Sequence, residues 1–322
     1  MRLLFQGDPS HRDLDTYGGL ELRFSVNWAH YIEQNGHQVY FLGADQVVSS
    51  AKNYDFVFDA PTWTSLPCPD HPHFHSYFSP GAPECLKGHC AWPILHPSVD
   101  GYKMGVALDE GIPRMFAPIP YPNSFLPTEM QEPFDRKLIL WANKASFTPG
   151  FGRQQSSMEH LRALAKLAKE FEFKVLFGGD AFIDAEPFKD EIGALLAIIP
   201  HALMGRIPWT ELVRLSAQTK LSLHPGGITG CVYESVFAKS LPLVPPGFWA
   251  FQEALKDTKL LSSPFADEAE VEEVLRHFWT DKEYYYKIHA IIQEDFEVNR
   301  NPQKQWKELE AFMLDHSSRS GV

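Results

Sequence analysis

Short apolar runs and amphipathic stretches alternate along most of this sequence. The chain opens with an apolar run at residues 2–5, and apolar residues then recur at helical spacing between Leu20 and Ile32. Two further apolar runs, at residues 37–43 and 54–60, have the continuous character of buried parallel strands. The pattern therefore predicts strand, helix, strand and strand in the first part of the chain.

The next segment lacks a clear period. Residues 61–100 are rich in Pro, His and aromatic side chains, and we expect loops and short pieces there. Residues 115–122 predict one last strand-like segment of this half. Residues 123–136 combine turn residues with charges, which is typical of an interdomain linker.

The second half repeats the rhythm of strands and helices. Strands are predicted at 137–143, 173–180, 220–226 and 241–246, and helices at 157–171, 205–219 and 232–240. Helical composition returns in the tail at Asp267–Phe278, Lys282–Phe296 and Gln303–Leu314. Alternating strands and helices predict an α/β fold with two doubly wound, Rossmann-like sheets facing a cleft.

Composition and charge narrow the class of protein. A length of 322 residues favours two domains, and the formal net charge of −12 disfavours nucleic acid as a partner. No apolar run approaches the roughly 20 residues that a membrane span needs. The four cysteines are too few for a disulfide framework, and the first residues are too polar for a signal peptide. We therefore expect a cytoplasmic protein.

Glu234 stands alone in an apolar, helix-like stretch behind the glycine-rich turn HPGGITG. In open α/β sheets ligands bind beyond the carboxyl ends of strands, and glycines let the backbone approach them. A helix that starts near Gly230 would point free N–H groups at an anion such as a diphosphate. Glu234, one turn later, could accept hydrogen bonds from ribose hydroxyls. The alternative is a plain helix-entry turn with a favourable N-terminal charge.

Several segments together resemble nucleotide-sugar glycosyltransferases of the GT-B fold, of the glycosyltransferase family 4-like type. They are MRLLFQGD, YGGLELRFSVNWAHYIEQNGHQVYFLG, PIPYPNSFLP, LILWANK, KVLFGGD, MGRIPWTELVRLSAQTKLSLHPGG and CVYESVFAKSLPLVPPG. They cover most of the chain in the expected order. The resemblance implies an acceptor-side domain at 1–130, a nucleotide-sugar-binding domain at 137–290, and a C-terminal helix at 291–322 that crosses back to the first domain.

The resemblance also implies roles for individual residues. Glu234 would bind the ribose of the donor, and a basic residue after the first strand of the second domain would neutralise the leaving diphosphate. Lys144 is the first candidate for that basic residue, with Arg153 next, and Arg206 would line the base pocket. The remaining donor-binding residues of the two glycine loops would be Gly18, Gly19, Thr229, Gly230 and Cys231.

One departure from the family pattern leaves the stereochemistry of transfer open. Many retaining members carry a second glutamate eight positions before the first, where this chain has Gly226. An inverting enzyme would need a general base in the first domain, for which Asp15, His11 and His89 are candidates. The resemblance implies that neither a metal nor another cofactor is needed, and it leaves the acceptor unidentified.

Other motifs suggest weaker alternatives. Residues 68–90 gather Cys and His residues, but their spacings match no common zinc module, and we interpret them as a loop. Asp13 and Asp15 form a DxD motif in the wrong context for a metal site, and neither a dinucleotide-binding glycine motif nor a P-loop is present. A nucleotide-sugar epimerase or hydrolase, and a non-catalytic nucleotide-sugar-binding protein, remain alternatives to a hexosyl or pentosyl transferase.

Overall fold

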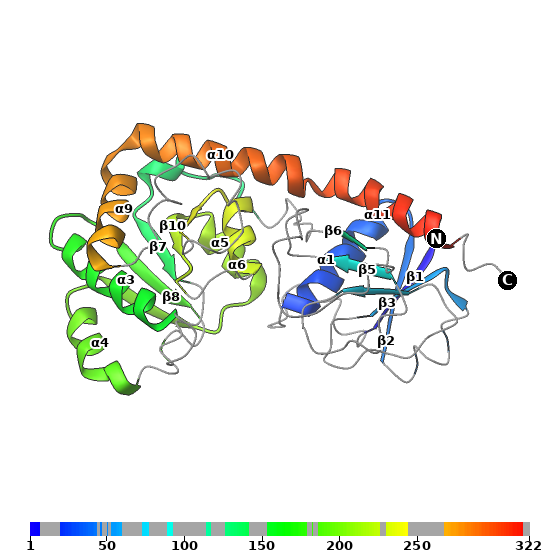
Figure 1. The fold of residues 1–322 in the computed structure, drawn as a ribbon, viewed down its shortest axis with the longest axis horizontal. Helices are drawn as coiled ribbons and strands as arrows, with labels where there is room; N and C mark the ends of the chain where they lie inside the picture. Colours follow the sequence, from blue (N-terminus) through cyan, green and yellow to red (C-terminus); the bar gives the residue numbers. More distant parts are fainter. Residues whose placement is uncertain are drawn as a thin grey trace. The chain divides into compact units, whose positions relative to one another are not determined.

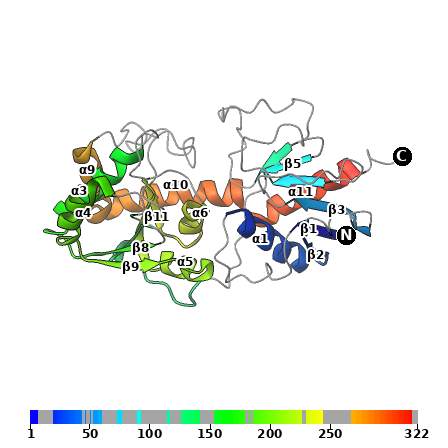
Figure 2. The same ribbon diagram turned by 90° about the horizontal axis from the view of Figure 1, so that it is seen from below.

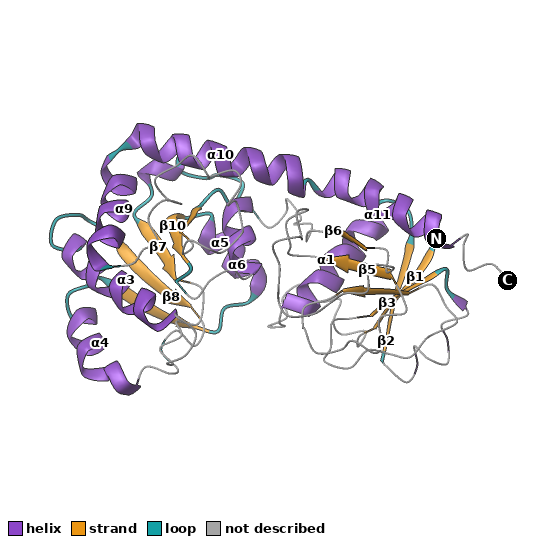
Figure 3. Ribbon diagram, viewed as in Figure 1, coloured by secondary structure: helices purple, strands orange, loops and turns teal. Residues whose placement is uncertain are grey.

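The structure is a computed structural model. The described residues are 1–6, 20–43, 46, 50, 53–59, 73–76, 89–92, 114–116, 126–141, 153–178, 182, 186–225, 230–243 and 267–317. Figure 3 separates the helices and strands from the residues that are not described. The chain divides into two units: residues 1–122 with 298–322, and residues 123–297.

The first unit contains a parallel sheet of six strands in the order β2-β1-β3-β4-β5-β6. The strands are β1 (Arg2–Gln6), β2 (Gln38–Leu42), β3 (Phe56–Asp59), β4 (His73–Ser76), β5 (His89–Trp92) and β6 (Arg114–Phe116). Helix α1 (Leu20–Gln34) connects β1 to β2 and buries Trp28, Ala29 and Ile32. The three central residues of β1, Leu3, Leu4 and Phe5, are apolar and fully buried.

The second unit contains a parallel sheet of five strands in the order β11-β10-β7-β8-β9. The strands are β7 (Leu138–Trp141), β8 (Lys174–Gly178), β9 (His201–Gly205), β10 (Thr219–Leu223) and β11 (Leu241–Leu243). The helices are α3 (Arg153–Leu167), α4 (Lys189–Leu196), α5 (Trp209–Ser216), α6 (Gly230–Phe237) and α9 (Glu268–Thr280), with 3-10 turns at Pro133–Asp135 and Glu186–Phe188.

Helices cover both faces of this second sheet. Figure 1 and Figure 2 show α3 and α9 on one face and α5 and α6 on the other. The sequence explains these layers, because successive apolar side chains of β7 point to opposite faces of the sheet. Leu140 packs with Leu212 and Leu215 of α5, whereas the Trp141 ring meets His160 of α3 edge-on at 6.2 Å. The predicted doubly wound α/β fold is therefore confirmed.

Two long helices end the chain. Helix α10 (Lys282–Arg300) belongs to the second unit up to Glu297, and α11 (Pro302–Ser317) belongs to the first. Trp306 of α11 is buried, with its ring 6.2 Å from that of Trp28 in α1. In the described part of the chain, no helix is long and apolar enough to cross a membrane.

Candidate functional site

The order of the strands locates the ligand-binding edge of the second unit. From β7 the chain moves outward to β8 and β9, then returns to the other side of β7 to form β10. Leu223 and Trp141 are paired at the carboxyl ends of β10 and β7. Such a reversal of strand order is the place where open α/β sheets bind ligands. The glycine turn directly follows β10, at this switch point.

Each of the two strands at the switch point is followed along the chain by a helix. Helix α3 starts at Arg153 after β7, and α6 starts at Gly230 after β10. Free N–H groups and the positive end of the helix dipole lie at the start of each helix. The first turns of α3 and α6, the helices that follow β7 and β10, therefore carry N–H groups suited to binding an anion.

Glu234 is the fifth residue of α6 and is almost completely buried, with 1% of its surface exposed. Glutamate is rarely buried to this extent unless its carboxylate has partners, because desolvation of a charge is costly. A solvated surface charge therefore does not describe Glu234. The side chain is placed within the protein, on the helix that follows the glycine turn.

A buried polar chain connects β10 to α6. Ser235 Oγ lies 2.8 Å from Ser222 Oγ and 2.7 Å from the carbonyl oxygen of Cys231, and its single hydroxyl proton serves one of these contacts at a time. Ser222 Oγ lies 2.8 Å from His224 Nε2. Burial lowers the pKa of His224 to about 3, so that its imidazole is neutral at neutral pH. This histidine is therefore a weak base, and the contact between Ser222 and Ser235 is the one that joins β10 to α6.

The remaining predicted residues of the second unit are spread along its carboxyl edge. Cys231 is half-buried and packs against the apolar cluster of Leu140 and Leu212. Arg206 is exposed and follows β9, where Gly205 turns the chain with a φ of 63°. The predicted residues that lie outside the described part of the chain are His11, Asp15, Gly18, Gly19, Lys144, Gly226 and Thr229.

The structure places His89 at the start of a strand. It is the first residue of β5 and pairs with Phe74 of β4, so it lies at the amino end of its strand. Ligands of parallel α/β sheets bind at the carboxyl ends. The position of His89 in the fold thus argues against a role as general base.

The described part of the segment between residues 61 and 100 consists of two short strands. Strands β4 and β5 both fall within it, and His75 and Cys90 are partners in their register. Among the residues whose side chains are described, no three His, Cys, Asp or Glu residues come together as a metal site. Most of the His- and Cys-rich segment at 68–90 lies outside those residues.

The polar chain of Ser222, His224 and Ser235 was not predicted from the sequence. Its signal was present, since Ser222 stands between two leucines of β10 and His224 follows the strand two positions later. Alternation with a period of two places both side chains on one face of β10. Polar residues on a face that should be apolar indicate a buried hydrogen-bonded group.

Comparison with known proteins identifies the fold. No protein-family model and no curated protein sequence matches the chain. HepE of Anabaena in complex with UDP and glucose superimposes with a TM-score of 0.64 at 11% identity, covering 98% of this chain and 100% of HepE. For sucrose-phosphate synthase from Thermosynechococcus elongatus, the TM-score is 0.61 at 11% identity, with coverage of 98% and 97%. The S. aureus MnaA–UDP structure gives 0.54 at 9%, with coverage of 96% and 94%.

These similarities extend over nearly the whole chain, including both units and the terminal helices. This chain has one parallel sheet in each unit. At identities this low, the similarity is one of fold. The chain therefore has the GT-B fold, with two Rossmann-like units.

Proposed function

We propose that this protein is a glycosyltransferase that moves a sugar from a nucleotide-sugar donor to an acceptor. The observation that carries the proposal is the position of Glu234. This carboxylate is buried on a short helix that begins directly after the glycine turn, beyond the carboxyl end of β10 at the switch point. A carboxylate so placed suits two neighbouring hydroxyls of a ribose better than it suits a phosphate.

The solved structures support a uridine nucleotide as the donor. HepE was crystallised with UDP-glucose, and the structures of TarM and MnaA from S. aureus also contain UDP. We therefore propose a UDP-sugar as the donor of this chain. Thr229, Gly230 and Cys231, at the end of the glycine turn and the start of α6, would donate backbone N–H groups to its diphosphate.

Transfer breaks the bond between the anomeric carbon and the diphosphate oxygen and forms a bond to an acceptor oxygen, which loses its proton. Developing charge on the leaving diphosphate would be stabilised by the start of α6 together with Lys144 or Arg153. The acceptor proton would pass to a base of the first unit, for which Asp15 and His11 remain candidates. We propose that no metal is needed, because backbone N–H groups and a basic side chain supply the positive charge.

The cytoplasm is the proposed location of this reaction. Four cysteines in 322 residues are too few for the disulfide framework of a small secreted domain.

One specific observation favours a second function. Gly226 replaces the glutamate that many retaining glycosyltransferases carry eight positions before Glu234. A protein that binds the donor without transferring its sugar would not need that carboxylate.

A nucleotide screen followed by a turnover assay tests the proposal. We expect UDP and a UDP-sugar to raise the melting temperature more than GDP, ADP or uridine does. Release of UDP that depends on an added acceptor would establish transfer. Release without an acceptor would indicate a hydrolase or an epimerase, and binding without release would indicate the second function. The absence of stabilisation by any nucleoside diphosphate would contradict the proposal.

A further inference from the structure

Helix α10 carries a row of hydrogen-bond donors at intervals of four residues, formed by Tyr285, His289 and Gln293 (the donor row). Tyr285 Oη donates to the carbonyl oxygen of Lys220 at 3.0 Å, and Gln293 Nε2 donates to that of Val236 at 2.7 Å. His289 Nε2 lies 3.3 Å from the carbonyl oxygen of Lys239. Residues four apart share one face of a helix, so the row aims three donors at backbone carbonyls of the second unit.

Two of the three acceptors lie at the carboxyl end of α6. The last carbonyls of a helix lack partners within it. Lys239 has a φ of 59°, and Ser240 N donates back to Ser235 O at 2.8 Å, which forms a Schellman-type ending. Within this ending Val236 O already accepts from Lys239 N at 2.9 Å, so Gln293 adds a second donor to that carbonyl, and His289 contacts the carbonyl of Lys239 from outside.

A buried cation reinforces the same end. Arg136 Nη1 donates to Lys239 O at 3.2 Å and to Thr219 O at 3.1 Å, and the side chain is 1% exposed. Positive charge is favourable at the carboxyl end of a helix because of its dipole. Desolvation by burial is the main cause that lowers the pKa of His289, and the neutral ring donates to the carbonyl through Nε2–H.

The carboxyl end of α6 is close to Glu234. Helix α6 has only eight residues, too few to be stable without tertiary contacts. Val236 follows Glu234 by two residues, which is about 3 Å along the helix axis. A contact that fixes the carbonyl of Val236 therefore also fixes the turn that presents Glu234.

We propose that Gln293 and His289 are positioning residues, which hold α6 so that Glu234 is ready for the donor nucleotide. They act through α6 and do not touch the nucleotide. The role in nucleotide binding rests on the proposed function, whereas the holding of α6 does not.

Substitutions of Gln293 test the proposal. Gln293→Leu removes the hydrogen-bond donor, and Gln293→Glu replaces it with an acceptor that repels the carbonyl. Gln293→Lys keeps a hydrogen-bond donor and adds a positive charge that the dipole of α6 favours. We expect amide hydrogen exchange in residues 230–237 to accelerate in the Leu variant, further in the Glu variant, and to return toward wild type in the Lys variant. The Kd for UDP should follow the same order, with a rise of roughly fivefold for Leu, the effect of one lost hydrogen bond.

Matched controls separate this role from general destabilisation. Gln303→Leu, on an exposed position of α11, should change neither measurement, and exchange in α3 should be the same in all variants. Equal exchange of residues 230–237 in wild type and in the Leu and Glu variants would overturn the proposal. Faster exchange with an unchanged Kd for UDP would overturn the role in positioning Glu234. Failure of the wild type to bind UDP would contradict the proposed function, and the exchange data would still decide whether the donor row holds α6.

Discussion

Lys239 is held in a backbone conformation that its side chain disfavours. Its φ of 59° lies in the left-handed region, where glycine is the usual residue at the end of a helix. The left-handed conformation costs a residue with a Cβ about 1–2 kcal/mol, and glycine loses about 0.5–1 kcal/mol in extra chain entropy. We predict that Lys239→Gly raises the free energy of unfolding by about 0.5–1 kcal/mol, measured by urea denaturation.

Alanine at the same position is the control for that prediction. It removes the lysine side chain but keeps the Cβ, so we expect Lys239→Ala to leave stability close to that of wild type. Equal stabilisation by alanine and glycine would show that the lysine side chain, and not its backbone, is unfavourable there.

His224 is expected to make the folded protein less stable at low pH. Burial lowers its pKa in the folded protein to about 3, below the ordinary value of 6.5, so the unfolded chain binds the proton more readily. The stability present above pH 6.5 is therefore lost as the pH falls toward 3, by at most about 1.4 kcal/mol per pH unit. The pKa of His289 is lowered in the same direction.

Urea unfolding at pH 7 and pH 4.5 checks this prediction. Both wild type and His224→Asn will lose stability, because carboxylates also titrate in this range. We predict a smaller loss for His224→Asn, which has no imidazole to protonate. Equal losses in the two proteins would contradict the assignment of a low pKa to His224.

The sequence identifies Glu234 as a candidate more readily than it identifies the groups that support this residue. A carboxylate in an apolar run is conspicuous, and its burial agrees with that signal. Arg136, His289 and Gln293 have ordinary positions in charged or amphipathic segments. These residues matter because of acceptors that are distant along the chain. The acceptor of Gln293 is 57 residues away and that of Arg136 is 103 residues away, and local sequence patterns do not encode such contacts.

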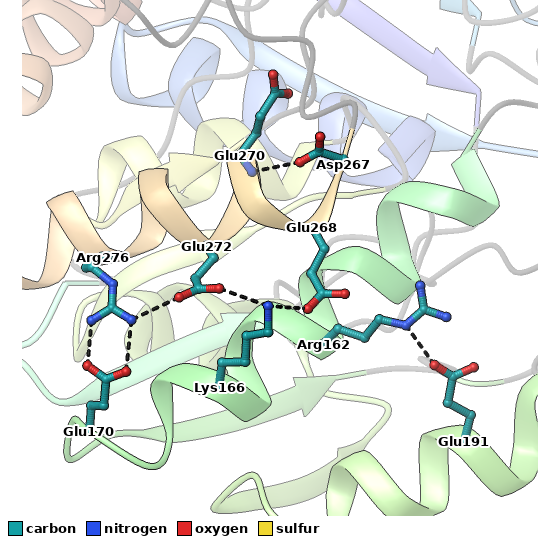
Figure 4. A network of polar contacts seen from close by, with 9 residues as sticks. All are labelled: Arg162, Lys166, Glu170, Glu191, Asp267, Glu268, Glu270, Glu272 and Arg276. Atoms are coloured by element: carbon teal, nitrogen blue, oxygen red, sulfur yellow. Dashed lines mark hydrogen bonds and ion pairs between the residues drawn. The ribbon is translucent and has the colours of Figure 1, made fainter.

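Helices α3 and α9 are joined by a network of ion pairs (Figure 4). Arg276 of α9 contacts Glu170, just after α3, at 2.6 Å, and Glu272 at 2.9 Å. Lys166 of α3 bridges Glu268 at 2.6 Å and Glu272 at 3.1 Å. Exposed pairs contribute little one by one, but a connected network with a bidentate arginine orders two elements together.

We predict that Arg276→Met lowers the melting temperature in dilute buffer and that the difference from wild type shrinks in 1 M NaCl. Salt screens exposed charges, with a Debye length of about 3 Å at 1 M. Arg214→Met is a suitable control, because Arg214 has a long contact of 3.9 Å with Glu211 on its own helix. A difference for Arg276→Met that persists unchanged in salt would mean that apolar packing, and not charge, is lost.

Among the elements, those with strong burial patterns agree best with the sequence. The predicted helices of the tail and the strands β1, β7, β8 and β10 all occur. Helix α4 and strand β9 were not predicted. Strand β9 lies at the edge of its sheet and exposes Leu203 and Met204, so it has no buried face to produce a regular pattern.

The chain as a whole leaves its first unit at residue 122 and returns to it at residue 298. The returning helix α11 buries Trp306 beside Trp28, and Glu310 contacts His37 Nε2 at 3.2 Å. The first unit is therefore completed by the end of the chain, whereas residues 123–297 form the second unit without interruption. The resemblance suggested this return, but the apolar periodicity of α11 alone did not identify its partner.

Trp306→Ala should therefore destabilise the first unit selectively. Loss of a buried tryptophan costs about 3–5 kcal/mol. We predict that hydrogen exchange accelerates in α1 and stays unchanged in α3. Acceleration in both helices would show that the two units unfold together.

The most direct test of the account asks whether Glu234 contacts the ribose of a nucleotide. Calorimetry would give the Kd of UDP and of 2′,3′-dideoxy-UDP for wild type and for Glu234→Ala. We predict that loss of the ribose hydroxyls weakens binding to wild type by about 1.5–3 kcal/mol, the range of hydrogen bonds to charged groups, and has little effect in the variant. The same loss in both proteins, or no binding of UDP to wild type, would contradict the central claim.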